Sequence, residues 1–540
     1  MPRIGAVTTK LGPFIEGVVT ALASLRLRWL RLWGRRPRWL TTRRALVALV
    51  GVVAVVLAVG PTNDPPPGPA TATAATAYVA GQYRGLHIPA LAVVAVSAGQ
   101  TSVRSFGADP EQPFVIGSVT KSLTALATMQ LVQAGKVRLD DPVVLYLPEF
   151  RTRSRSASDR ITVRQLLSQT SGLTTDAGLL GFHHPATTLE GQVSDLASVS
   201  TDPPGRFRYS NANFEVLGEL IATVSGASYA DYLEKRVFAP LDMRHSFTDL
   251  PAARAAGLRA GHRVWFGVPV TDGIYYRADF VPAGFVVSTA GDLGHYLTAL
   301  LDRGRYRGTS VLAPRYVAQM LAPSADASAL RQHKTYGFGW YQEKIGKARV
   351  VTHPGGAINT RADIVLVPSR HAAVAALGNA ESVPYEVFPR LDIVTANAAM
   401  TAAGLPRRGN LSGLYEVFDL LALAILAVLA RSLLRAWRHR GNGLRDMSRP
   451  RLLFTLWREL LVPVALLVEV PRRLGGGPGA LLGSDVGLVV VCWVVLGLGA
   501  FIVRVLPWRG RTRTAALSVC AHGDTGIRDD QAGGGVLQRG

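Results

Sequence analysis

The sequence predicts an α+β domain joined to α-helical membrane segments, on three observations. Residues 78–405 have mixed polarity and alternate between helix-like and strand-like patterns separated by turns. Apolar runs with few charges lie outside this stretch. Of the formal net charge of +22, the segments 1–44, 431–451 and 504–540 carry +9, +6 and +3, and all three flank apolar runs. This is the positive-inside pattern of a membrane protein, so we expect a membrane partner and no nucleic-acid partner.

The N-terminal region is predicted to anchor the chain. Residues 1–44 are rich in Arg and Trp and indicate a basic cytosolic segment at a membrane surface. Residues 45–60 are uncharged and predict a transmembrane anchor. A signal peptide cleaved near residues 70–77 is the alternative, but the charged leader is long for one. Residues 61–77, rich in Pro, Ala and Thr, predict an extended linker.

The domain 78–405 begins with a strand pair, predicted for Leu91–Val96 and Val103–Phe106. Apolar residues then recur at helical spacing from Ser118, and Gly135 stands where a C-terminal cap would end the helix. The middle, about 140–250, is predicted to be helical and rich in loops.

Three successive strands are predicted near the end of the domain, at Arg349–His353, Ala362–Val367 and Ala372–Leu377. Gly355-Gly356 predicts a turn after the first of them, and residues 368–370 join the other two.

The C-terminal region, residues 406–506, is predicted to hold three transmembrane helices, at about 414–430, 452–470 and 486–506. The second is interrupted by charges, so an interfacial or re-entrant helix is its alternative. If all three helices span the membrane, every basic flanking segment lies on the cytosolic side. Residues 507–540 are then a cytosolic tail, and the α+β domain lies outside the cell membrane.

Ser118 and Lys121 carry the first chemical signal. Residues three apart on a helix share a face, so the lysine amine can reach the serine hydroxyl. Serine needs a nearby base to become a nucleophile, and a lysine whose pKa is lowered by burial can be that base. The helix N-terminus adds N–H groups suited to an oxyanion. The plain alternative is a helix-capping serine with a solvated lysine.

Tyr209 and Asn211 carry the second signal. Asn211 can cap a helix that ends near Gly226, which would present Tyr209 at the mouth of a cleft. A neighbouring Lys121 would favour the phenolate, so the two could share one proton and act as a joint base. The alternative is a buried, hydrogen-bonded tyrosine beside an ordinary cap.

His353, Gly355 and Gly356 carry the third signal. Glycine allows a close approach of the backbone to a ligand, and the N–H groups of Gly356 and Ser118 could hold an oxyanion together. His353 could bind substrate or tune the base, although a hairpin turn with an incidental histidine is the alternative. We expect no metal and no cofactor, since His183-His184 lacks the ligand spacing of a metal site.

These residues together resemble the serine β-lactamase and penicillin-binding protein superfamily, specifically its class C β-lactamase, DD-peptidase and esterase branch. Ser118–Lys121 is similar to the nucleophile motif, Tyr209–Asn211 to the Tyr-x-Asn motif, and His353–Gly355 to a His-x-Gly variant of the Lys-Thr-Gly motif. Four further phrases look like the same branch: Leu166–Leu173, Phe238–Met243, Ser288–Leu293 and Tyr336–Trp340. The resemblance covers roughly residues 80–400.

The resemblance implies a β-lactamase/DD-peptidase-like fold, in which an antiparallel sheet flanked by helices meets a helical lobe at the site. It also implies acylation of Ser118 followed by hydrolysis or transfer. In that scheme Lys121 and Tyr209 move protons, and Asn211 positions substrate and Lys121. The N–H groups of Ser118 and Gly356 hold the oxyanion.

His353 departs from the family pattern, in which a lysine stands at this position. Histidine is mostly neutral at pH 7, so substrates that bear a carboxylate lose an anchor unless another cation supplies one. Arg361 is the nearest candidate in sequence, and together with Gly355 it is predicted to bind substrate. The departure favours esterase or amidase action.

We therefore expect a membrane-anchored, extracytoplasmic serine hydrolase that forms an acyl-enzyme on Ser118. Its substrates would be peptidoglycan-type peptides, esters or β-lactams, as for a D-Ala-D-Ala carboxypeptidase, an esterase or a β-lactamase. A catalytically silent binding or sensor domain coupled to membrane helices is the alternative function. The sequence leaves the exact substrate and the oligomeric state open.

Overall fold

The structure, a computed structural model, describes residues 69–179, 188–328, 334–381 and 390–407, and isolated helical residues between 426 and 499. The chain divides into two compact units. The first contains all of the described residues up to 426, and the second comprises residues 427–464 and 492–540, of which short helical stretches such as residues 492–496 are described.

The described helices include none that is both long enough and apolar enough to cross a bilayer. The predicted spans at 45–60 and 452–470 lie outside the described residues, and those at 414–430 and 486–506 lie largely outside them. The flanking segments 1–44, 507–540 and the pair His183-His184 lie outside as well. These assignments therefore stay predictions.

An antiparallel sheet of eight strands forms the centre of the first unit, in the order β2-β1-β14-β13-β12-β11-β10-β9. Its strands are β1 Leu91–Ser97, β2 Gln100–Phe106, β9 Ala325–Asp326, β10 Thr335–Tyr336, β11 Tyr341–Ile345, β12 Ala348–Ala357, β13 Thr360–Val367 and β14 Ala372–Gly378. The smaller sheets are formed by β15 Ala380–Glu381 with β4 His262–Trp265 and β5 Val268–Thr271, by β3 Phe114–Val115 with β6 Val287–Ser288, and by β7 Arg305–Tyr306 with β8 Thr309–Ser310.

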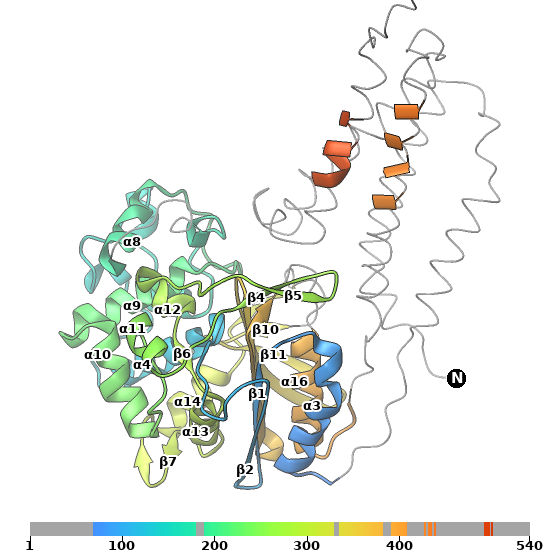
Figure 1. The fold of residues 1–540 in the computed structure, drawn as a ribbon. Helices are drawn as coiled ribbons and strands as arrows, with labels where there is room; N and C mark the ends of the chain where they lie inside the picture. Colours follow the sequence, from blue (N-terminus) through green and yellow to red (C-terminus); the bar gives the residue numbers. More distant parts are fainter. Residues whose placement is uncertain are drawn as a thin grey trace, which may run out of the picture. The chain divides into compact units, whose positions relative to one another are not determined.

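Helices cover both faces of the large sheet (Figure 1). Helices α3 Ala72–Leu86 and α16 Arg390–Ala402 pack side by side on one face. The other face meets α13 Ala290–Leu301 and a helical lobe. The remaining helices are α4 Thr120–Gln133, α5 Arg155–Ser158, α6 Val163–Leu167, α8 Leu189–Asp195, α9 Ala212–Ser225, α10 Tyr229–Leu233, α11 Leu250–Ala255, α12 Val281–Gly284 and α14 Pro314–Leu321.

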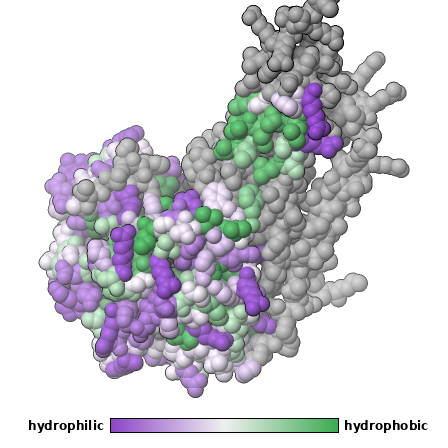
Figure 2. Space-filling view, viewed as in Figure 1, coloured by the Kyte–Doolittle hydropathy of each residue, from purple (hydrophilic) through white to green (hydrophobic). Residues whose placement is uncertain are grey.

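The strands β1 and β14 are almost wholly apolar because both of their faces are covered. Every residue of β1 is buried. Side chains alternate across a strand, so Val94 joins the core of the helical lobe and Val93 the core under α3 and α16. Outside these cores the unit is polar, and Figure 2 shows hydrophilic side chains over most of its visible face.

Most of the predicted elements are confirmed, and two boundaries are wrong. Helix α3 begins at Ala72, inside the predicted linker 61–77, because Ala72 and Ala75 bury their side chains against the sheet. The predicted turn at Gly355-Gly356 is absent from β12, which continues through both glycines to Ala357. The chain turns two residues later, before β13.

Candidate active site

Ser118 lies in a 3₁₀ turn, Gly117–Val119, that leads directly into α4. Its side chain is partly exposed, whereas Lys121 in the first turn of α4 is fully buried. The Lys121 Nζ lies 2.9 Å from Ser118 Oγ, 2.7 Å from Asn211 Oδ1 and 2.5 Å from the carbonyl oxygen of Ala283. The structure thus brings together Ser118, Lys121 and Asn211, as the sequence predicts.

These three contacts suit a lysine that acts as a base. The oxygens of Asn211 and Ala283 accept hydrogen bonds and cannot donate them. A neutral amine has two N–H groups and one lone pair, so both N–H groups can be used by these two acceptors. The lone pair is then left for the hydroxyl of Ser118 at 2.9 Å, which is the geometry needed to remove its proton.

Burial also adjusts the proton affinity of Lys121. Loss of hydration lowers the pKa of Lys121 from 10.5 to about 7, and the carboxylate of Glu215 opposes part of this shift. Burial in turn raises the pKa of Glu215 to about 8. The Gln192 side chain and the nearby Lys121 oppose part of this rise, but burial outweighs them. A neutral amine and a neutral acid can therefore coexist behind Ser118 near pH 7.

Tyr209 and Asn211 lie at the start of α9, directly across from α4. The Lys121 Nζ lies 5.0 Å from the centroid of the Tyr209 ring. Asn211 precedes the helix, but its side chain makes no capping hydrogen bond. The predicted capping role is therefore wrong, because the amide oxygen binds Lys121 and the amide nitrogen donates to the Gly178 carbonyl.

Strand β12 passes against the 3₁₀ turn that carries Ser118. A Cβ atom on Gly117 would lie 2.8 Å from the Gly356 nitrogen, and one on Gly355 would lie 2.1 Å from the Ile116 carbonyl oxygen. Glycine is therefore required on both sides of this contact. Gly355-Gly356 therefore lies where the backbone of β12 closely approaches the turn at Gly117. The glycines serve this close approach, and the strand continues through them without the predicted turn.

The register of β12 indicates where the Gly356 N–H points. Ala357 and Thr360 flank a two-residue loop, and the pairs of an antiparallel ladder alternate between bonded and non-bonded. Gly356, opposite Arg361, is then a non-bonded pair, so its N–H is directed away from β13. On that side, β11 pairs with β12 only as far as Thr352. The Gly356 N–H is thus left without a strand partner, next to the turn that carries Ser118.

His353 lies within β12 and is buried beside an aromatic wall formed by Phe207, Tyr209, Tyr336 and Tyr341. Its Nδ1 lies 2.8 Å from the Pro354 carbonyl oxygen, which accepts only, so Nδ1 carries the proton. In the neutral ring Nε2 is then an acceptor, and the Tyr336 hydroxyl lies 3.2 Å from it. His353 is held in place by its own strand and by Tyr336.

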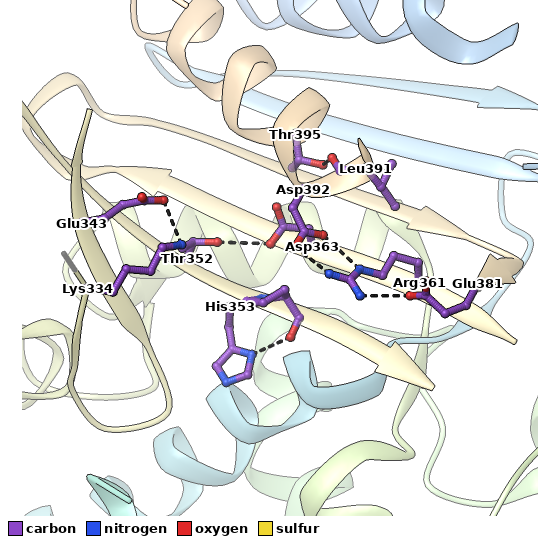
Figure 3. Close-up of polar contacts among 11 residues, drawn as sticks. Lys334, Glu343, Thr352, His353, Arg361, Asp363, Glu381, Leu391, Asp392 and Thr395 are labelled. Carbon is purple, nitrogen blue, oxygen red and sulfur yellow. Dashed lines mark hydrogen bonds and ion pairs between the residues drawn. The ribbon is translucent and has the colours of Figure 1, made fainter. Parts of the chain in front are cut away.

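Arg361 does not reach the site. It projects from the face of β13 covered by α3 and α16, opposite the face of Ile364 (Figure 3). Its guanidinium binds Asp392 through Nε at 3.0 Å and Nη2 at 2.6 Å, and Glu381 through Nη1 at 2.9 Å. The prediction that Arg361 binds substrate is therefore wrong, because two carboxylates behind the sheet hold its charge.

Three groups at the site were not predicted from the sequence. Glu215 could have been noticed, because it lies one helical turn after Asn211 among the apolar residues of α9. Tyr336 belongs to a family phrase but had no assigned role. The Ala283 carbonyl is a backbone group and has no sequence signal. Among the described residues, no cluster of three or more His, Cys, Asp or Glu could hold a metal ion.

A partly exposed serine in contact with a fully buried lysine, between a sheet and a helical lobe, is the arrangement expected of a serine acyl-transfer site of the β-lactamase type. Comparison with known families agrees: the β-lactamase family profile matches residues 75–395. The chain belongs to the β-lactamase family.

Curated relatives include Protein flp of Staphylococcus aureus (strain NCTC 8325 / PS 47), which is 24% identical over 444 residues, covering 78% of this chain and 85% of that protein. A putative penicillin-binding protein, PbpX of Bacillus subtilis (strain 168), is 29% identical over 234 residues, covering 43% of this chain and 54% of that protein.

Solved structures share the fold. The octameric penicillin-binding protein homologue from Pyrococcus abyssi aligns with a TM-score of 0.52 at 24% identity, covering 65% of this chain and 80% of that one. A class C β-lactamase aligns with a TM-score of 0.51 at 18% identity, covering 61% of this chain and 94% of that one.

Proposed function

We propose that this protein is a serine hydrolase that works through an acyl-enzyme on Ser118. The observation that carries the proposal is the fully buried amine of Lys121, in contact with both Ser118 and Asn211. A lysine without this role is costly to bury, since burial disfavours its charged form.

In the proposed acylation step, Lys121 accepts the Ser118 proton as Oγ attacks the substrate carbonyl carbon. The N–H groups of Ser118 and Gly356 bind the oxyanion that develops on the carbonyl oxygen. Collapse of the tetrahedral intermediate expels the alcohol or amine leaving group. That group takes a proton from the Lys121–Tyr209 pair, so the pair returns to its resting protonation state.

In the proposed deacylation step, water enters the place of the leaving group. The Lys121–Tyr209 pair removes a proton from this water as the oxygen attacks the acyl carbon. The same two N–H groups stabilise the second oxyanion. Ser118 then recovers its proton from the pair as the acid is released.

We further propose that neutral esters or amides are better substrates than molecules anchored by a carboxylate. The support is the state of the cations around His353. Lys334 forms an ion pair with Glu343 at 3.0 Å, and both side chains are largely buried. Arg361 is neutralised behind the sheet. A carboxylate on the substrate would have to compete for these charges with existing partners.

We also propose that the hydrolase unit works outside the cytoplasm, next to the cell membrane. The support is the sequence pattern, in which the basic stretches 1–44, 431–451 and 504–540 flank apolar runs. Peptidoglycan-type peptides would be within reach of a unit anchored there.

The test is covalent labelling of the purified chain with a fluorophosphonate and with a fluorescent penicillin, read by intact mass, with Ser118→Ala as the control. Labelling by the fluorophosphonate and weak labelling by the penicillin would support an esterase or amidase. Strong penicillin labelling at Ser118 would contradict the proposed substrate preference. If neither probe labelled Ser118, the hydrolase proposal would fail and a silent binding domain would replace it.

A further inference from the structure

Gln169 is a buried residue in the phrase Leu166–Leu173, to which the mechanism above assigns no role. It follows α6 and its cap residue Ser168, and its φ is +61°. This left-handed conformation is unfavourable for a residue with a side chain. Such a conformation persists where the surrounding contacts fix it, and it is commonest at functional sites.

The side-chain oxygen and the backbone carbonyl of Gln169 both bind the segment that carries Tyr209 and Asn211. The side-chain oxygen Oε1 accepts from the backbone N–H of Ser210 at 3.0 Å and from Asn213 Nδ2 at 2.5 Å. The backbone carbonyl accepts from the Arg208 N–H at 2.8 Å. Gln169 therefore binds this segment at three residues: Arg208, Ser210 and Asn213.

Neighbours of Gln169 extend this attachment. The Thr170 carbonyl accepts from the Gly205 N–H at 2.8 Å, and Ser171 Oγ donates to Asn213 Oδ1 at 2.5 Å. Burial raises the pKa of the Tyr336 hydroxyl, and the nearby Gln169 side chain opposes a small part of this rise. Tyr336 in turn contacts His353. Gln169 thus lies between the second and third motifs of the site.

We propose that Gln169 is a positioning residue that holds the side chains of Tyr209 and Asn211 in place next to the Lys121 amine. A single acceptor oxygen holds the Ser210 N–H, and the residues on either side of Ser210 are the two that face the lysine amine. Loss of that oxygen leaves the buried Ser210 N–H without its acceptor and leaves Asn213 Nδ2 with the Ser210 carbonyl alone. The segment then has to shift to find other acceptors.

The first experiment measures the rate constant for phosphonylation of Ser118 by a fluorophosphonate in the purified full-length chain. Gln169→Met keeps the length of the side chain and removes the acceptor oxygen. We expect the rate constant to fall at least about tenfold, since small misplacements of catalytic groups slow acyl transfer strongly. Gln169→Glu keeps an oxygen at the same reach, and we expect it to recover most of the rate.

Asn379→Leu is the matched control. Asn379 is also buried, and its Oδ1 accepts from the Ala90 N–H while its Nδ2 donates to the Ala260 carbonyl, away from Ser118. This variant loses a buried acceptor too, so its thermal midpoint should fall as much as that of Gln169→Met. Its phosphonylation rate constant should stay within about twofold of the wild type. Equal rate losses in the two variants would overturn the proposal.

The second experiment does not depend on the proposed function. Hydrogen–deuterium exchange of the peptide that covers residues 205–213 reports the Ser210 N–H directly. We expect faster exchange there in Gln169→Met and no change there in Asn379→Leu. Unchanged exchange in Gln169→Met would overturn the proposal even if Ser118 were unreactive in the wild type. A wild type that exchanges as expected but is not labelled would contradict the hydrolase function and leave the positioning role standing.

Discussion

At the scale of single residues, the site is built from polar groups that the fold removes from water. Burial lowers the pKa of Lys121 to about 7, which suits the base role proposed for it, and burial likewise raises the pKa of Glu215 to about 8. Arg361 shows the opposite outcome of burial. Its charge is matched by Asp392 and Glu381, so it holds structure together and is not available to substrate.

The pKa of Lys121 predicts how acylation depends on pH. Below about pH 7 the amine is protonated and has no lone pair for the Ser118 proton. The rate constant for phosphonylation of Ser118 should therefore rise about tenfold for each pH unit up to about 7 and level off above it. Measurement of this rate constant from pH 5 to 9 tests the prediction. A rise that continued toward pH 10 would mean that the lysine is hydrated and has its ordinary pKa.

Substitution of Arg361 should destabilise the protein and leave substrate binding alone. Arg361→Met leaves the buried Asp392 and Glu381 without their cation, which should lower the free energy of unfolding by about 3–5 kcal/mol. Chemical denaturation measures this loss. Arg259→Met is the control, because Arg259 pairs with Asp109 at an exposed site and should contribute about 1 kcal/mol or less. If Arg361→Met raised KM without lowering stability, Arg361 would have to be assigned to substrate binding after all.

At the scale of elements, the contact between β12 and the turn before α4 sets the geometry of the proposed oxyanion site. Two glycines allow it, and Gly355 leaves space for the Ile116 carbonyl. The strand therefore fixes the Gly356 N–H relative to Ser118 without a side chain between them.

Gly355→Ala should separate β12 from the turn that carries Ser118. The added Cβ would lie 2.1 Å from the Ile116 carbonyl oxygen, so one backbone has to move and the Gly356 N–H moves with it. We expect a loss of about 100-fold in the rate of acylation, similar to the loss of one oxyanion donor. Stopped-flow kinetics with an activated ester can measure it.

Gly81→Ala is the control for that substitution. Gly81 lies within α3 and a Cβ there would meet nothing within 4 Å. Alanine should stabilise this helix by about 0.5–1 kcal/mol and leave the acylation rate unchanged. If Gly355→Ala behaved as this control does, the oxyanion assignment of Gly356 would be wrong.

The elements that local patterns describe were predictable from sequence. The β1–β2 hairpin and helices α4 and α9 follow their apolar periodicity, and Gly226 ends α9 with a φ of +71°. The turn predicted at Gly355-Gly356 is wrong because a glycine pair indicates a turn when only neighbouring residues are considered. In the folded chain the missing side chain leaves room for the backbone near Gly117, more than 200 residues away in sequence. Gln169 could not have been found, because its partners meet only in the folded chain.

Of the site itself, residue types were predictable and their orientations were not. Asn211 is a residue type that commonly caps helices, but its side-chain amide oxygen binds Lys121 and makes no cap. A buried amine needs hydrogen-bond acceptors, and this need outweighs the cap. Strand alternation alone places Arg361 and Ala362 on opposite faces of β13. Which face meets Ser118 depends on the packing of the whole sheet.

At the scale of the whole molecule, the first unit has the candidate active site on one face of its large sheet and the Arg361 ion pairs on the other. Helix α3 belongs to this unit, although its sequence resembles a linker. The Thr76 hydroxyl lies 2.9 Å from that of Ser102 on β2, and Ala72, Ala75 and Val79 are buried.

A truncated protein that begins at residue 78 should therefore be less stable than one that begins at residue 69. It lacks the first two turns of α3, and the sheet beneath them becomes exposed. We expect a lower thermal midpoint by several degrees, from about 2 kcal/mol or more of lost burial. Calorimetry of proteins 69–407 and 78–407 measures the difference. Equal midpoints would restore the linker assignment of residues 72–77.

The first and last helices of the unit lie together, and their outer ends almost touch. The Ser97 hydroxyl contacts the carbonyl oxygens of both Ala70 and Ala402, at 3.4 and 2.8 Å, and a Cβ on Gly404 would lie 2.9 Å from that of Ala70. Within the described residues 69–407, the chain therefore enters and leaves at neighbouring points. A domain whose ends lie close together can be inserted into a loop of an unrelated protein without distortion of either structure. It can also be circularly permuted, with its original ends joined by a short linker and new ends created in another loop.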